Sequence, residues 1–455
     1  MSITARNTPV VGTPDEVSYR LEPGSSLVGE VQVPGDKSMS HRAIMFGAIA
    51  HGVTEVRGFL EGEDSLHTLA ACRAMGVEIT RGAPGEVTLV GRGPAALSAP
   101  RDTIYLGNSG TAMRLMSGLL AGIGLSCRLS GDASLNGRPM RRVVDPLNLM
   151  GANIASDPDG TPPLVLSAGA SLEGIEYTCP VASAQVKSCV LLAGLHATGR
   201  TIVHEPGITR DHTERMLRGF GVEVDVDGLS ASIVGGQRLQ ATAIDVPGDI
   251  SSAAFFLVGA AMTPGSRLRL PGVGMNPSRD GVIQILRLMG ASIGIENPGL
   301  SGGEPVADLV VEGTRLRGID VPRELVSLAI DEFPALFVAA AAAEGTTVVS
   351  GAAELRVKET DRIQVMVDGL HALGARLDAT PDGAIIQGGG RLAGGTADSR
   401  GDHRTAMSFA IASLIADAPV SVLDCANVDT SFPGFASAAR NVGLAIAEQR
   451  QAADA

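Results

Sequence analysis

The sequence VPGDKSMSHRA at residues 33–43 recurs as VPGDISSAAFF at residues 246–256, about halfway along the 455-residue chain. Both copies begin with the same four residues and continue into a run rich in small and apolar residues. The charge is not repeated, because Lys37 and Arg42 have no counterparts in the second copy, which carries Ile250 and Ala254 or a neighbour there. Two copies of one segment predict two related domains, and the unrepeated charge points to function.

A second phrase recurs six times: the apolar end of a helix, then Gly, then a strand-like run, as in CRAMGVEI (72–79). The glycines of the six copies are Gly76, Gly151, Gly221, Gly290, Gly374 and Gly443. Glycine directly after the last helical turn is the expected C-terminal cap. A mostly apolar second helix lies between successive copies, and such helices are usually buried. The spacing therefore predicts an α/β chain of six strand–helix–strand–helix–strand units, three in each domain.

The first copy of the repeated segment resembles a nucleotide-binding loop, in which Gly directly precedes Lys and Ser or Thr follows it. Here Asp36 separates Gly35 from Lys37, and its carboxylate would point at the phosphates. This spacing argues against an ATP site. Lys37, Ser38 and Arg42 can still bind another anion, and Ser38 and Arg42 would share one face of a helix.

Composition argues against several classes of protein. The net charge of −13 and the aromatic content of 3% do not suit a nucleic-acid surface. The five cysteines include no CxxC, and the eight histidines show no paired ligand spacing, so no metal site is predicted. No apolar run is long enough to span a bilayer, and the N-terminal residues lack the apolar run of a signal peptide. We expect a cytoplasmic protein that binds neither nucleic acid nor membrane.

Cationic residues gather at the starts of the repeated helices and in the turns before them. These clusters contribute Lys37, Arg42, Arg138, Lys187, Arg210, Lys358, Arg362, His403 and Arg404. Each cluster alone is equally typical of a helix cap or a solvated face. Together, at equivalent ends of two related domains, they predict a cleft for a ligand with several negative charges. Asp331 and Glu332, which precede a buried helix, add acids suited to proton transfer.

Six motifs stand in the order found in the 5-enolpyruvylshikimate-3-phosphate (EPSP) synthase family: PGDKSMSHR, GNSGTAMR, SAQVKS, IDEFP, LRVKETDR and DHRTAMSFA. The chain resembles this family from about residue 27 to residue 446. RDHTE (210–214) and NPSR (276–279) resemble signatures of the family's second class, which includes inhibitor-tolerant members.

The resemblance implies two inside-out α/β barrel domains, each built of three βαβαββ repeats. We place the first domain at residues 34–246 and the second at residues 247–455, and we expect residues 1–33 to join the second. The hinge between the domains is expected near the two VPGD segments.

The resemblance also implies a reaction: transfer of the enolpyruvyl group of phosphoenolpyruvate (PEP) to the 5-hydroxyl of shikimate 3-phosphate, with release of phosphate. This reaction belongs to the shikimate pathway to chorismate and aromatic amino acids. No metal or organic cofactor is implied, and a monomer is expected. By the same resemblance Asp331 takes the proton of the 5-hydroxyl, Glu359 handles the proton at the PEP methylene, and Lys37 contacts PEP and shares the proton transfer.

The resemblance assigns further residues to each substrate. Those implied for PEP are Lys37, Gly110, Arg138, Gln185, Arg362 and Arg404. Those implied for shikimate 3-phosphate are Lys37, Ser38, Arg42, Ser183, Ala184, Gln185, Arg210, Asp331 and Lys358.

The chain departs from the family pattern at three positions. Ala184 stands where many first-class members have a second serine, and Thr430 stands where they have a lysine. Gly110 stands where tolerant second-class members have alanine. We therefore expect Gly110 to leave room for glyphosate, an inhibitor that occupies the PEP site.

Two other functions are considered. A UDP-N-acetylglucosamine enolpyruvyl transferase has the same fold, but it has Lys-Asn where this chain has Lys37-Ser38. It also has a cysteine in the loop that reads SGDASLNGRP here. A catalytically silent binding homologue is the second alternative, and the intact Lys37, Asp331 and Glu359 argue against it.

Overall fold

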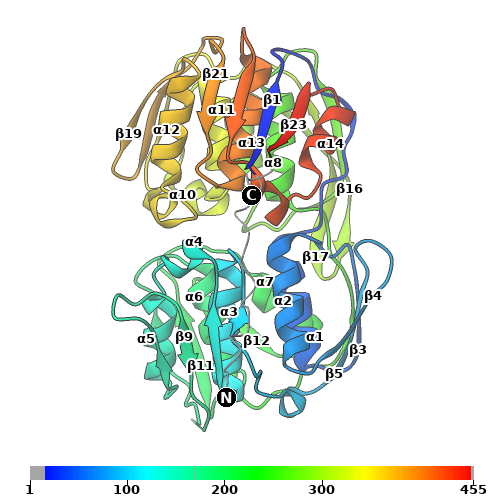
Figure 1. Cartoon of the computed structure of the whole chain (residues 1–455), viewed down its shortest axis with the longest axis vertical. Helices are drawn as coiled ribbons and strands as arrows, with labels where there is room; N and C mark the ends of the chain where they lie inside the picture. The colour runs from blue at the N-terminus through cyan, green and yellow to red at the C-terminus, as the bar shows by residue number, and fades with distance from the viewer. Residues whose placement is uncertain (1–15, 170, 452–455) are drawn as a thin grey trace, which may run out of the picture.

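The computed structural model describes residues 16–169 and 171–451, and in this part of the chain small sheets surround a set of helices (Figure 1). Six sheets are formed, five of four strands and one of three. In every four-stranded sheet one strand pair is parallel and the other two pairs are antiparallel. The three-stranded sheet consists of two antiparallel pairs. Six sheets agree with the six units that the recurring glycines predict.

Three sheets are built from residues between 51 and 245. Their strand orders are β14–β3–β5–β4 (Ala243–Asp245, His51–Arg57, Val87–Arg92, Glu78–Arg81), β6–β7–β9–β8 (Ile104–Tyr105, Cys127–Ser130, Leu164–Leu166, Ile154–Ala155) and β10–β11–β13–β12 (Glu176–Thr178, Arg200–His204, Ser230–Val234, Val224–Asp227). Strand β14 pairs with β3 from the opposite end of this segment, so the first sheet closes only after the third is complete.

The other three sheets belong to the second half of the chain. Their strand orders are β2–β15–β17–β16 (Val28–Glu30, Arg267–Gly274, Glu304–Glu312, Ser292–Ser301), β18–β20–β19 (Thr346–Val349, Gly383–Gln387, Arg376–Thr380) and β21–β22–β1–β23 (Gly395–Asp398, Val420–Leu423, Glu16–Leu21, Ile446–Gln451). Strands β1 and β2 come from the start of the chain, yet they pair with β22, β23 and β15.

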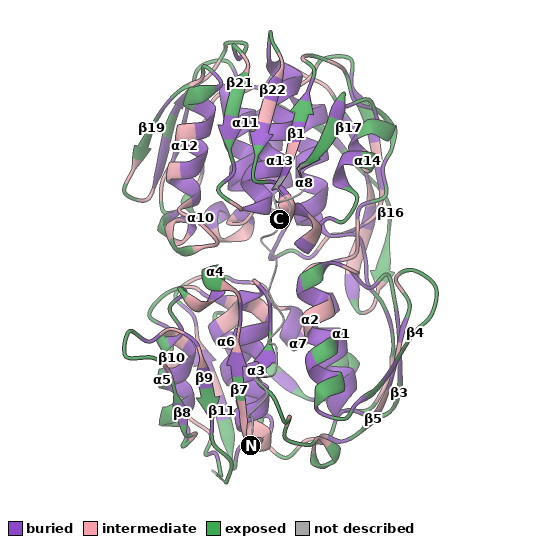
Figure 2. Ribbon diagram, in the orientation of Figure 1, coloured by how far each residue is buried: buried purple, intermediate pink, exposed green. Residues whose placement is uncertain are grey.

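The helices that follow the repeated segments are the most buried, and Figure 2 shows them largely purple inside the ring of sheets. These inner helices are α1 (Lys37–Ile49), α3 (Gly110–Ile123), α6 (Ala184–Gly194), α8 (Ile250–Ala261), α11 (Phe333–Ala342) and α13 (His403–Ala412). The remaining helices are α2 (Glu63–Ala74), α4 (Ala133–Asn136), α5 (Arg141–Leu149), α7 (His212–Gly219), α9 (Gly281–Leu288), α10 (Arg323–Val326), α12 (Arg362–Ala372) and α14 (Phe435–Asn441). Helices inside and sheets outside are the inside-out arrangement that the family resemblance implies.

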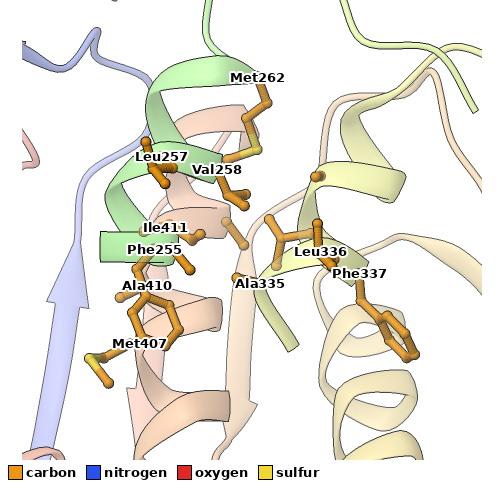
Figure 3. Close-up of a cluster of buried hydrophobic side chains, with 14 of the residues drawn as sticks. Phe255, Leu257, Val258, Met262, Ala335, Leu336, Phe337, Met407, Ala410 and Ile411 are labelled. Carbon is orange, nitrogen blue, oxygen red and sulfur yellow. The ribbon is translucent and has the colours of Figure 1, made fainter. Parts of the chain in front are cut away.

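The apolar side chains form two separate cores. One core contains buried residues between Met39 and Val246, and the other contains residues of 17–33 and 250–446. Figure 3 shows part of the second core, where side chains of α8, α11 and α13 pack against one another. The domain boundaries predicted above stay a prediction, and their outermost parts, residues 1–15 and 452–455, lie outside the described residues. No helix of the described chain is long and apolar enough to cross a membrane.

The six recurring glycines take the backbone conformation that a C-terminal cap requires. Their φ angles lie between 81° and 107°, which side chains with a Cβ rarely adopt. At the opposite end, five of the six inner helices are capped by a side chain that accepts a hydrogen bond from a backbone N–H. These caps are Asp36, Ser109, Ser183, Asp249 and Asp402. The repeated phrases thus mark both ends of the repeated helices, as predicted.

Candidate active site

Residues from both halves of the chain line two adjoining hollows. The first, here called the polar pocket, has a volume of about 80 Å³. The second, here called the side cavity, has a volume of about 550 Å³. The polar pocket is lined by Lys37, Ser38, Asp64, Gly110, Thr111, Arg114, Arg138, Gln185, Arg210, Asp249, Arg279, Asp331, Glu354, Val357, Lys358, Glu359, Arg362, His403 and Arg404. Ser183, Ala184 and Arg323 line the side cavity, together with Gln185, Arg210, Asp331, Glu354, Val357 and Lys358, which both hollows share.

Helix N-termini contribute much of the polar pocket. Lys37, Gly110, Arg362 and His403 are the first residues of α1, α3, α12 and α13, and Gln185 is the second residue of α6. The first N–H groups of a helix have no partner within the helix, and the helix dipole is positive at this end. Five such ends directed at one pocket suit an anionic ligand.

The side chains of the polar pocket add net positive charge. Eight lysine and arginine side chains line it against five carboxylates. His403 does not add to the charge, because burial, followed by the nearby Lys37 and Arg404, holds the pKa of the imidazole well below its usual value. The excess of cations persists although the chain as a whole carries a charge of −13.

Asp331 lies where the polar pocket meets the side cavity. Its carboxylate contacts Arg210 of the first half, Arg362 at 3.0 Å and Lys358 at 3.6 Å. Burial alone would raise the pKa of Asp331, but Lys358 and Arg210, with other cations, hold it well below its usual value. The carboxylate is therefore charged, and it is held by cations from both halves.

Glu359 occupies a similar position deeper in the polar pocket. One oxygen contacts Arg362, and the other lies 3.4 Å from Nη1 of Arg138, which belongs to the first half. Burial alone would raise the pKa of Glu359, but Arg362 and Arg138 hold it well below its usual value. Two carboxylates thus lie near each other, and each is paired with a cation of the opposite half.

The other cations of the pocket are also held in place. Nζ of Lys37 lies 3.0 Å from Asp64, and Nη1 of Arg404 donates to the backbone carbonyl of Asp331 at 3.1 Å. These contacts orient Lys37 and Arg404 from opposite sides of the pocket.

Gly110 lies beside two guanidinium groups at the start of α3. A Cβ at this position would lie 3.1 Å from a nitrogen of Arg114 and 3.1 Å from a nitrogen of Arg138. Gln185 accepts a hydrogen bond from Arg114 and donates one to Thr111 at 3.0 Å. The absence of a Cβ at residue 110 therefore leaves space beside the guanidinium groups of Arg114 and Arg138.

All of the predicted site residues except Arg42 line one of the two hollows. The Arg42 guanidinium is buried in the first half, where it donates to Thr213 at 2.7 Å, Ser188 at 3.0 Å and the Ser38 carbonyl at 2.9 Å. Lys187, from one of the cationic clusters, is likewise buried, between Glu205 and Glu214. Thr430 does not line either hollow, and its hydroxyl donates to the Asn427 carbonyl at 2.6 Å.

Several pocket residues were not predicted as site residues. They include Asp64, Arg114, Asp249, Arg279 and Glu354. Arg114 is part of the GNSGTAMR motif and Arg279 of the NPSR motif, so the motifs contained a signal for these two. Asp64, Asp249 and Glu354 reach the pocket through tertiary contacts that their sequence spacing does not indicate.

The chain is similar to known proteins over nearly all of its length. The model of the family described as EPSP synthase (3-phosphoshikimate 1-carboxyvinyltransferase) matches residues 21–438. The chain belongs to the EPSP synthase family. Proteins named 3-phosphoshikimate 1-carboxyvinyltransferase from Nitrosococcus oceani and Methylococcus capsulatus are 57% and 58% identical to it. Each alignment covers 95% of this chain, and 97% and 98% of those proteins respectively.

The fold is also that of solved members of the family. A 2.37 Å structure of EPSP synthase from Acinetobacter baumannii superposes with a TM-score of 0.86 at 53% identity, and the match covers 95% of this chain and 100% of that chain. The two-domain α/β fold is therefore confirmed. The relatives also confirm that the chain is an enolpyruvyl transferase of the shikimate pathway, and they do not favour the UDP-N-acetylglucosamine alternative.

Proposed function

We propose that the polar pocket binds PEP and that the side cavity binds shikimate 3-phosphate, with Asp331 between them. The division of most of the predicted residues supports this assignment, although Ser38, implied for shikimate 3-phosphate, lines only the polar pocket. Gly110, Arg138, Arg362 and Arg404, implied for PEP, line only the polar pocket. Ser183 and Ala184, implied for shikimate 3-phosphate, line only the side cavity.

The position of Asp331 is the observation that carries the proposal. A base that takes the proton of the 5-hydroxyl must reach the atom of one substrate that attacks the other, and Asp331 lines both hollows. In our proposal the 5-hydroxyl oxygen bonds to the central carbon of PEP while Asp331 accepts its proton. The PEP methylene gains a proton from Glu359 or Lys37, which gives a tetrahedral intermediate. One methyl proton then returns to the group that donated it, the C–O bond to phosphate breaks, and the enolpyruvyl ether and inorganic phosphate remain.

The substrates compete with the carboxylates for the same cations. Arg362 contacts both Asp331 and Glu359, and Arg138 contacts Glu359. The phosphate and carboxylate of PEP are also bidentate partners for these guanidinium groups. When an arginine turns to the substrate, the carboxylate loses the cation that lowers its pKa. Binding therefore prepares Asp331 and Glu359 to take up protons.

We also propose a monomer in the cytoplasm. The three residues implied for proton transfer, Lys37, Asp331 and Glu359, meet at the polar pocket within a single chain. All five cysteines are free thiols, and four of them are buried, which suits a reducing compartment.

Substitution of the two acids tests the assignment. We expect Asp331→Asn and Glu359→Gln each to lower kcat by about a thousandfold, the loss typical of a missing general acid or base. Shikimate 3-phosphate should still bind to both variants in calorimetry, because the cations remain. Glu176→Gln is the control, since the exposed side chain of Glu176 on β10 contacts His204 of β11, at 2.9 Å, and lines neither hollow. A variant of Asp331 or Glu359 with nearly normal kcat would contradict the assigned roles.

A further inference from the structure

The two VPGD segments lie side by side where the chain passes between the domains. The Asp36 N–H donates to the Pro247 carbonyl, and the Asp249 N–H donates to the Pro34 carbonyl, both at 2.8 Å. Gly35 also lies against Gly58, the residue that follows β3, and a Cβ on Gly35 would overlap the Gly58 carbonyl oxygen, so the chain requires glycine at this position. The caps of α1 and α8 are thus brought next to each other.

A single guanidinium group joins the two caps. Arg279 lies between β15 and α9, and its side chain is almost completely buried. Nη1 contacts the carboxylate of Asp36, and Nη2 donates to Oδ1 of Asp249 at 3.0 Å and to Oγ of Ser251 at 2.6 Å. Two buried carboxylates would repel each other without this cation.

Contacts lead from Arg279 to the reacting groups of both domains. On one side, Oδ2 of Asp249 accepts a hydrogen bond at 3.1 Å from the backbone N–H of Lys37, whose ammonium group lies in the polar pocket. On the other side, Ser251 donates to Glu332, the neighbour of Asp331 in the chain. Glu332 also lies 3.8 Å from Arg404.

A second set of contacts holds the two domains together at the same place. Asn276, in the same motif as Arg279, donates to Asp211 at 2.7 Å and to Glu304 at 2.8 Å. Glu304 in turn lies 2.8 Å from Nδ1 of His212. Asp211 and His212 directly follow Arg210, so this interface fixes the segment that brings Arg210 to Asp331. The RDHTE and NPSR motifs therefore lie in contact across the domain boundary.

We propose that Arg279 is a positioning residue for the transfer reaction, because it sets Lys37 of one domain against Asp331 of the other. The inference rests on the proposed roles of Lys37 and Asp331. Lysine cannot replace arginine here, since a single ammonium group cannot hold Asp36, Asp249 and Ser251 in the geometry of a planar fork. A shift of about 1 Å between reacting groups can lower a rate by about a hundredfold.

The test compares Arg279→Lys with Arg269→Lys. Arg269 is the matched control, because it also joins two carboxylates, Glu30 and Asp308, but it lies on the exposed side of β15, away from both hollows. We expect Arg279→Lys to lower kcat by about 10- to 100-fold, while the dissociation constant of shikimate 3-phosphate changes by less than about threefold. Arg269→Lys should keep its kcat. Both are assayed well below their unfolding temperatures.

Loss of stability alone would not give this result, because folded Arg279→Lys would then have normal kcat. Equal kcat for folded Arg279→Lys and wild type would overturn the proposal. If Arg279→Lys does not fold, Ser251→Ala decides, because it breaks the link to Glu332 and leaves the ion pairs in place. A fall of about three- to tenfold in its kcat supports the proposal, since one lost hydrogen bond corresponds to about 1 kcal/mol, and unchanged kcat contradicts it. An inactive wild type would refute the proposed function itself, which separates the two failures.

Discussion

Helices α1 and α8 both follow the sequence Val-Pro-Gly-Asp, and in both the aspartate caps the helix. They differ in the residues that come next. Helix α1 begins with Lys37 and Ser38, which line the polar pocket. Helix α8 begins with Ile250, which is buried in the apolar core of the second domain. The comparison shows that the repeat supplies the backbone, whereas a few unrepeated side chains make one helix part of the active site.

The largest effect on stability is expected when a lysine is placed in the second VPGD copy, at the position that corresponds to Lys37. Ile250→Lys buries an ammonium group beside Asp36 and Glu304. These carboxylates already bind Arg279 and Asn276, so the new charge gains no carboxylate of its own and must crowd Arg279. We therefore expect a loss of more than about 3 kcal/mol in the free energy of unfolding. Urea denaturation measures this. Ile250→Val is the control and should cost only about 1 kcal/mol. A stable Ile250→Lys variant would show that α8 is less embedded than the structure indicates.

The reverse exchange removes the charge from α1. Lys37→Ile should lower kcat by about a thousandfold, the range of a lost proton-transfer group, and leave the protein folded. The double variant Lys37→Ile/Asp64→Asn removes the carboxylate that the first change leaves without its cation. Both variants should be similarly inactive while the double variant is the more stable by thermal unfolding. Activity near that of wild type in either variant would contradict the claim that Lys37 makes α1 part of the active site.

The contribution of the helix cap Asp36 to stability can be tested by lowering the pH. Burial alone would raise the pKa of Asp36, but Arg279 lowers it from 3.8 to about 2. Because the folded pKa is the lower one, the stability from this group is fully present above about pH 4 and is lost as the pH falls towards 2. The contribution is about 2 kcal/mol. Urea denaturation between about pH 5 and about pH 2.5 should show a shallower fall in stability for Asp36→Asn than for wild type.

The exposed pair of Asp245 with Arg57 provides the control for the acid experiment. Asp245→Asn should follow the wild-type curve, since exposed ion pairs contribute little. Identical curves for Asp36→Asn and wild type would contradict the role given to Arg279.

The smallest effect concerns the space beside Gly110. Its added Cβ would lie 3.1 Å from Arg114 and from Arg138, so both guanidinium groups must shift by a few tenths of an ångström. We expect Gly110→Ala to raise the inhibition constant of glyphosate by about tenfold or more and the KM of PEP by less, because one methyl group in a pocket is worth 1–3 kcal/mol. Steady-state inhibition measures both. Equal changes for the two ligands would contradict the prediction.

The sequence predicts the scaffold well, because its signals are local. A cap such as Asp36 or a glycine such as Gly76 acts within one helical turn, so its position in the chain is sufficient. The inside-out arrangement came from the family resemblance. The strands β1 and β2 show what local signals cannot give, since their pairing depends on residues several hundred positions away.

The site was predicted less completely, and the reason is also physical. Arg42 and Lys187 stand near the starts of inner helices like the other cations, but they face Thr213 and Glu205 inside the first domain. Sequence spacing does not show which side chains of a helix point into the pocket. Arg279 and Asp249 were missed because each also binds a residue of the first half of the chain, Asp36 and Lys37 respectively, which their sequence spacing does not indicate.

The most direct test of the account is release of phosphate from PEP by the wild-type protein. The assay is run with shikimate 3-phosphate, with UDP-N-acetylglucosamine in its place, and with PEP alone. Two hollows joined at Asp331 predict release that requires shikimate 3-phosphate. Release only with the UDP-sugar, or no release from folded protein that binds shikimate 3-phosphate, would contradict the account.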